Sequence, residues 1–139
     1  MRRTTLKLLA ASSLALAAFP AIADKPRKVD KRLLGTWRSD KERTTKLWRY
    51  KIELDAERKT KFESIFGKLT RRFTTTHAYS EFDGEKTSRT YRVVASDAQS
   101  VVLSSSERGR IELEQIFFED EWFYVISGYN LEFFHRVEA

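Results

Sequence analysis

Apolar positions along this chain change their spacing twice, and the change predicts one helical insertion within a series of strands. Residues 33–38 form a short β-type run. Between residues 40 and 66 the apolar side chains recur at helical spacing, which predicts two short helices. The Ser39–Glu42 pair is typical of a capping box, and Asp55 is a plausible N-cap for the second helix.

After Gly67 the period shifts towards two, which is the spacing of strands. The predicted strands cover residues 68–75, 77–82, 87–95, 101–103, 111–118, 122–126 and 131–137. Asp83-Gly84 predicts a tight hairpin turn, and a change of parity at Gln115 predicts a bulge there. The fold class that follows is mainly β. We expect a small antiparallel barrel of roughly eight strands, with two short helices inserted after the first strand.

A Gly-x-Trp motif on the first strand and a basic residue on the last strand add a family resemblance. Gly35-Thr36-Trp37, together with Arg136, resembles the lipocalin and fatty-acid-binding (calycin) group, and in particular small exported lipocalin-like proteins of bacteria. The resemblance implies that Gly35, Trp37 and Arg136 close one end of the barrel. It also implies one lipocalin-like domain over residues 33–139, whose helical insertion (about 40–66) lies near the barrel mouth.

The candidate ligand-facing residues are Arg89, Tyr91, Trp122 and Tyr124. Aromatic walls with a few polar groups suit a small amphipathic ligand, and Arg89 could pair with a carboxylate or phosphate on it. The alternative is a barrel filled by its own side chains. Barrels of eight strands do both, so the two readings stay open here.

The C-terminal third is rich in aromatic residues: Phe117, Phe118, Trp122, Phe123, Tyr124, Tyr129, Phe133 and Phe134. Adjacent aromatics must point to opposite faces of a sheet, so both faces need apolar cover. The outer cover is either the helix pair, through Trp48 and Phe62, or a second copy of the chain. A homodimer would use outward positions, for which Phe123 and Phe134 are candidates.

Catalysis finds little support in the sequence, and we predict that the protein is not an enzyme. The chain has no cysteine and two histidines, His77 and His135, and it shows no nucleophile, metal-ligand or phosphate-loop motif. Glu112, Glu114, Glu119, Asp120 and Glu121 form an acidic run that is typical of a solvated strand edge. We therefore expect neither a cofactor nor a metal.

The N-terminus indicates export. Arg2, Arg3 and Lys7 precede an apolar stretch that ends at Ala21-Ile22-Ala23, which predicts a cleaved signal peptide over residues 1–23. The Sec route is favoured over the twin-arginine route, because Thr5 stands where that signal carries an apolar residue. The stretch is too short for a stable membrane span. The expected location is periplasmic or secreted.

The distribution of charge along the chain is consistent with an exported protein. The chain carries 26 basic and 20 acidic side chains, a net charge of +6. Removal of the signal peptide leaves +3, and much of that excess lies in a basic leader over residues 24–32. We interpret the leader as a solvated segment, with weak attraction to anionic lipid as an alternative. Because the basic excess is local and the compartment holds no chromosome, we expect no nucleic-acid partner.

Two function classes remain open from the sequence. The first is an exported bacterial protein that binds a small apolar or amphipathic ligand inside its barrel. The alternative is a non-enzymatic interaction module of the cell envelope, which acts as a homodimer or binds a partner and has a filled barrel.

Overall fold

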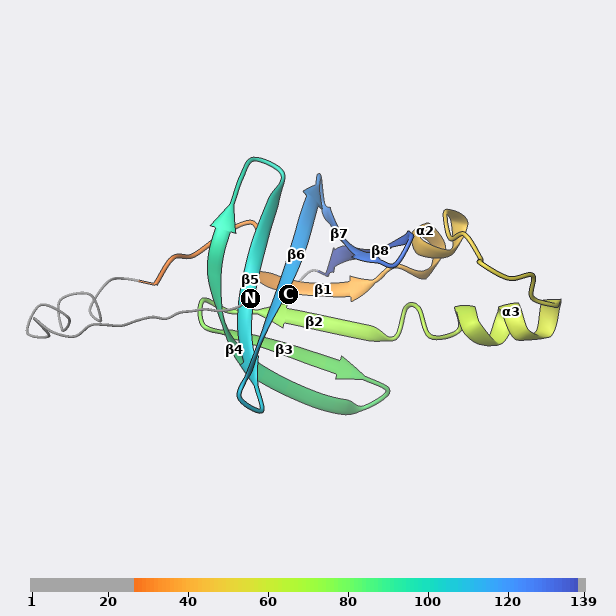
Figure 1. Ribbon diagram of the computed structural model, residues 1–139, viewed down its shortest axis with the longest axis horizontal. Coiled ribbons are helices and arrows are strands. Elements are labelled where there is room, and N and C mark those ends of the chain that lie inside the picture. The colour runs from red at the N-terminus through yellow and green to blue at the C-terminus, as the bar shows by residue number, and fades with distance from the viewer. Residues whose placement is uncertain (1–26, 138–139) are drawn as a thin grey trace, which may run out of the picture.

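Eight antiparallel strands close into one barrel in the computed structural model, which describes residues 27–137 (Figure 1). Each strand pairs with the next along the chain, and β8 returns to pair with β1, as in Trp37 opposite Arg136. The strands are β1 (Gly35–Ser39), β2 (Leu69–Phe73), β3 (His77–Phe82), β4 (Glu85–Ser96), β5 (Ser100–Glu107), β6 (Arg110–Glu119), β7 (Trp122–Ser127) and β8 (Asn130–Val137). The predicted fold class is confirmed, including the two short helices after the first strand.

The β3–β4 hairpin forms where the sequence predicted it. Phe82 pairs with Glu85, so Asp83 and Gly84 make a two-residue turn. Both residues have positive φ, 52° and 85°, which matches the right-handed twist of the flanking strands and favours this Asp-Gly pair.

Helices α2 (Lys41–Lys46) and α3 (Ala56–Glu63) form the insertion between β1 and β2. Asp55 caps α3 as predicted, since its carboxylate accepts from the Arg58 amide at 2.8 Å. The capping residue of α2 is Asp40, whose carboxylate accepts from the Arg43 amide at 2.7 Å. The predicted Ser39 cap is wrong, because the Ser39 hydroxyl instead accepts from the Gly67 amide at 3.0 Å.

Helix α2 packs against β8, whereas α3 projects away from the barrel (Figure 1). The guanidinium of Arg43 lies over the rings of Trp122 and Phe133, at 4.5 and 4.6 Å from their centroids. Helix cover of the outer aromatic face is thus present, but not through Trp48 and Phe62. Those two rings pack against each other at 5.5 Å, within the insertion itself.

The predicted bulge at Gln115 is also wrong. Pairing between β5 and β6 runs without interruption from Ser100 opposite Phe117 to Glu107 opposite Arg110. The register shifts on β4 instead, between Val93 and Ala95. The side chains of β6 consequently keep one alternation along the whole strand, which decides what faces the interior.

The predicted signal peptide, residues 1–23, and the first residues of the leader lie outside the described residues. From Arg27 onward the leader contacts the barrel: the Arg27 guanidinium donates to the Tyr91 carbonyl, and the Arg32 guanidinium donates to the Ala98 carbonyl at 2.9 Å. This part of the leader is therefore not simply solvated. No helix within residues 27–137 has the length and apolar character needed to cross a membrane.

Candidate functional site

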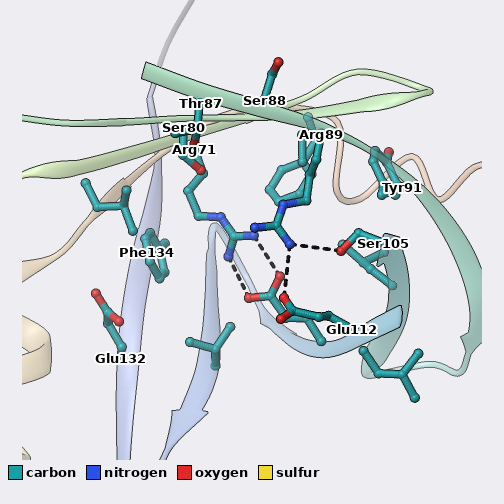
Figure 2. A pocket seen from close by; sticks show the side chains of 17 residues that line it. Arg71, Ser80, Thr87, Ser88, Arg89, Tyr91, Ser105, Glu112, Glu132 and Phe134 are labelled. Carbon is teal, nitrogen blue, oxygen red and sulfur yellow. Dashed lines mark hydrogen bonds and ion pairs between the residues drawn. The ribbon is translucent and has the colours of Figure 1, made fainter. Parts of the chain in front are cut away.

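A cavity of about 490 Å³ occupies one half of the barrel interior (Figure 2). It lies towards the end where the β3–β4 and β5–β6 hairpins turn, and we call this the open end. Its lining is Leu69, Arg71, Phe73, Ala78, Ser80, Thr87, Ser88, Arg89, Tyr91, Leu103, Ser105, Glu112, Leu113, Glu114, Val125, Glu132 and Phe134. A volume of this size is typical of pockets that take small molecules, which span about 300–1,000 Å³.

The other half, the packed end, is filled by side chains. Trp37, Phe123 and Phe134 are almost fully buried there, and the Phe123 ring lies 4.7 Å from the ring of each of the other two. Arg71 marks the boundary between the halves: its guanidinium lies 5.0 Å from the Phe73 ring centroid. The barrel is therefore filled at one end and hollow at the other.

An ion pair crosses the hollow half. The Arg71 side chain, 14% exposed, donates two hydrogen bonds to the Glu114 carboxylate, at 2.9 and 2.8 Å. The two parallel bonds match the planar guanidinium to the planar carboxylate, which is the strongest form of this contact. The pair joins Arg71 of β2 to Glu114 of β6 within the cavity lining. Figure 2 shows the Arg71 side chain extending into the cavity.

Strand β6 places its charges inward and its apolar residues outward. Glu112 and Glu114 line the cavity, whereas Ile111 and Leu113 are 75% and 68% exposed. The continuous pairing with β5 causes this, because Ile116 is fully buried in the core and positions two and four residues before it must share its face. Glu114 is thus only partly exposed and departs from the solvated edge that the sequence predicted, whereas Glu112 lines the cavity with a side chain that is still 54% exposed.

Two predicted site residues, Arg89 and Tyr91, do line the cavity from β4. Arg89 donates to the carboxylates of Glu107 and Glu112 at 2.8 and 3.2 Å. Tyr91 is buried, its hydroxyl donates to the Thr74 carbonyl at 2.5 Å, and burial raises its pKa above the ordinary value. Arg89 therefore already has carboxylate partners within the protein, and Tyr91 forms part of the wall.

The other two predicted site residues, Trp122 and Tyr124, do not line the cavity. Their neighbours on β7, Phe123 and Val125, face the interior, so the alternation of the strand turns Trp122 and Tyr124 outward. The Trp122 ring packs under Arg43 of α2. The interior orientation predicted for these two residues is wrong.

The same alternation corrects the residues suggested for a dimer contact. Phe123 and Phe134 are buried inside the barrel, so neither is an outward position. Besides Trp122, the outward aromatics include Phe117, Tyr124 and Phe133, whose rings follow one another across three strands at centroid distances of 5.1 and 5.4 Å. Homodimerisation stays a prediction. Because Tyr124 points outward, it replaces Phe123 and Phe134 as the position at which a substitution would test for a dimer.

The residues predicted to close the barrel come together at the packed end. The Arg136 guanidinium lies 4.1 Å above the Trp37 ring and donates to the Leu34 carbonyl at 2.7 Å. Gly35 has φ +118°, and a Cβ placed on it would lie 2.8 Å from Arg136 Nη1. Glycine is therefore needed at this position for both its backbone conformation and its lack of a side chain.

Glu132 was not recognised from the sequence and lines the cavity from β8. Its carboxylate accepts one hydrogen bond, from the Ser39 hydroxyl at 3.4 Å. Burial raises the pKa of Glu132, and the neighbouring Glu114 adds to the shift, while Ser39 and Arg71 oppose it. No group of three or more His, Cys, Asp or Glu side chains placed to hold a metal occurs within the described residues 27–137.

Sequence reasoning missed Arg71, Glu114 and Glu132 for one physical reason. Apart from Arg89, no charged residue was assigned to the barrel interior, whereas Arg71, Glu114 and Glu132 all line the cavity. The available signal was that Ile111 and Leu113 cannot share a face with the buried Ile116 unless a bulge intervenes.

Comparison with protein-family models, curated proteins and solved structures gave no match for this chain. The closed eight-stranded antiparallel barrel is compatible with a lipocalin-like fold. The architecture itself therefore carries the functional argument.

Proposed function

We propose that this protein is exported, belongs to the lipocalin-like group, and binds a small amphipathic molecule inside its barrel without transforming it. The observation that carries the proposal is the cavity of about 490 Å³, with an apolar floor and charged walls. An interior of this kind suits a ligand with an apolar body and one polar end, because each part meets groups of its own character.

The inverted pattern of β6 supports the same function. Ile111 and Leu113 are exposed, so their apolar surface is not buried, whereas Glu112 and Glu114 line the cavity and are paired there with Arg89 and Arg71. Local departures from the inside–outside rule are expected at functional sites.

Binding without catalysis fits the contacts of the cavity carboxylates. Glu112 and Glu114 are engaged in ion pairs with Arg89 and Arg71, so their carboxylates are occupied within the protein. The lipocalin-like assignment rests on the barrel topology together with the stacking of Arg136 on Trp37.

A pair of tryptophan substitutions tests the proposal. Ser105 lines the cavity and its neighbour Ser106 is exposed on the other face of β5, so Ser105→Trp fills the cavity and Ser106→Trp does not. The neutral fluorescent probe N-phenyl-1-naphthylamine should bind the parent protein and Ser106→Trp with enhanced emission. We expect binding to Ser105→Trp to fall at least tenfold.

Equal probe binding by both variants would overturn the barrel interior as the site, provided that circular dichroism shows both to be folded. Export is tested separately, by expression of the full chain in a bacterium and measurement of the mass of the periplasmic product. The expected mass is that of residues 24–139.

A further inference from the structure

We propose that the cavity selects a ligand whose polar end is a protonated amine, and that Glu132 is the residue that receives it. This inference deepens the proposed function and rests on it. It reverses the sequence-based expectation that Arg89 would bind a carboxylate or phosphate.

Both arginines of the cavity already have their charge matched. Arg71 makes its two hydrogen bonds with Glu114, and Arg89 contacts Glu107, Glu112 and the Ser105 hydroxyl. An anionic ligand that used either guanidinium would have to displace one of these carboxylates. The displaced group would then lie beside the incoming anion, which makes this exchange unfavourable.

The charge of Glu132, in contrast to that of the two arginines, is not matched by an ion pair among the described residues. Glu132 is half-buried, and within residues 27–137 it accepts only the long 3.4 Å hydrogen bond from Ser39. Figure 2 shows its carboxylate on the cavity wall next to Phe134, apart from the Arg71 and Arg89 contacts. An acceptor in such a place is available to a donor from a ligand.

The net charge of the side chains that line the cavity also favours a cationic ligand. Two guanidinium groups, Arg71 and Arg89, face three carboxylates, Glu112, Glu114 and Glu132. The surplus is one negative charge, and it lies at the carboxylate without a cationic partner. A ligand with one positive charge neutralises the cavity, whereas a second negative charge would be repelled.

The surroundings of Glu132 define the rest of the ligand. Leu69, Val125 and Phe134 line the same cavity and offer an apolar surface to an alkyl or aromatic body. An ammonium group supplies up to three donors, so it can satisfy more than one lone pair of the carboxylate. The recognised class is therefore a primary amine on an apolar body of modest size.

Three probes with the same alkyl chain separate the contribution of the head group: octylamine, octanol and octanoate, titrated calorimetrically at pH 7. We expect octylamine to bind about tenfold more tightly than octanol, as a charge-assisted hydrogen bond implies, and octanoate to bind most weakly. Glu132→Gln keeps the size of the side chain and removes its charge. In that variant the affinities for octylamine and octanol should agree to within about twofold.

Glu57→Gln, on the exposed α3, is the matched control and should keep the preference for octylamine. Octanol binding by Glu132→Gln verifies that its cavity is intact. A pH series adds a second readout: octylamine binding should weaken as Glu132 becomes protonated, while octanol binding stays constant. The charged groups that shift this titration are Arg71 and Glu114.

The outcomes distinguish the two proposals. If the parent protein binds all three probes equally, or if Glu132→Gln retains the preference, the amine assignment is overturned and binding in the barrel stands. If none of the three probes binds and Ser105→Trp leaves probe fluorescence unchanged, the proposed function itself is overturned.

Discussion

At the packed end of the barrel Phe123 is fully buried between Trp37 and Phe134, whereas at the open end Arg71 and Glu114 meet across a cavity. Strands β7 and β8 contribute to both ends, since β7 carries Phe123 in the packed core and Val125 in the cavity lining, and β8 carries Phe134 in the core and Glu132 in the lining. The difference arises from which residues each strand points inward along its length. Apolar packing is concentrated at one end, and the cavity lies at the other.

The largest expected contrast between the ends comes from two truncations on β7. Phe123→Ala removes a ring from the packed end and should lower the free energy of unfolding by about 3–5 kcal/mol. Val125→Ala, at the cavity wall, should cost about 1–2 kcal/mol, because the cavity leaves part of that side chain without packing partners. Urea unfolding of both variants measures the difference, and equal losses would contradict the division of the interior.

A glycine substitution probes how the packed end is closed. Gly35→Ala should destabilise the protein by about 2 kcal/mol, because the new Cβ meets Arg136 Nη1 and the positive φ is unfavourable for alanine. Gly84→Ala shares the positive φ, with no atom within 4 Å, and is the matched control. It should cost about 1 kcal/mol. Thermal unfolding compares the two, and an equal cost would mean that Arg136 moves aside freely.

The ion pair at the open end should contribute less than the aromatic packing. Arg71→Met leaves the Glu114 carboxylate without its partner, and we expect a loss of about 1–2 kcal/mol, moderated by the partial exposure of Glu114. Arg71→Met combined with Glu114→Met should recover part of that loss. A double-mutant cycle measures the coupling, and additive effects would show that the pair contributes no net stability.

Glu132→Gln should have the smallest effect, and its sign depends on pH. Because the pKa of Glu132 is raised in the folded protein, the folded state keeps a proton that the unfolded chain has already lost. Stability from this group therefore falls as the pH rises through the unfolded and then the folded pKa. Glutamine does not ionise, so Glu132→Gln should be more stable than the parent protein at pH 7 and lose this advantage below about pH 4.

Unfolding midpoints of the parent protein and the variant, measured from pH 3 to pH 8, test this expectation. Glu57→Gln provides the baseline for loss of a charge on an exposed helix. A stabilisation that did not change with pH would arise from packing or hydrogen bonding and not from the titration of Glu132.

Most of the fold could be predicted from residues that lie close together in the chain. Asp83-Gly84 predicted its hairpin, and Asp55 predicted the start of α3, because turns and caps depend on residues close together in the chain. The Ser39 cap failed because its hydroxyl is used by the Gly67 amide, a partner 28 residues away. Arg89 and Tyr91 of the candidate site were predicted, since they share a face of β4 that carries a clear alternation.

The sequence by itself determined the number of strands, their turns and the two helices, because these follow from local spacing and from the residues that favour caps and turns. Only the tertiary structure decided which faces of β6 and β7 point inward. Both faces of these strands carry apolar residues, so their own pattern leaves the orientation open. Pairing with β5 and β8, and the buried positions of Ile116 and Phe123, settle it and bring Glu114 and Glu132 into the cavity.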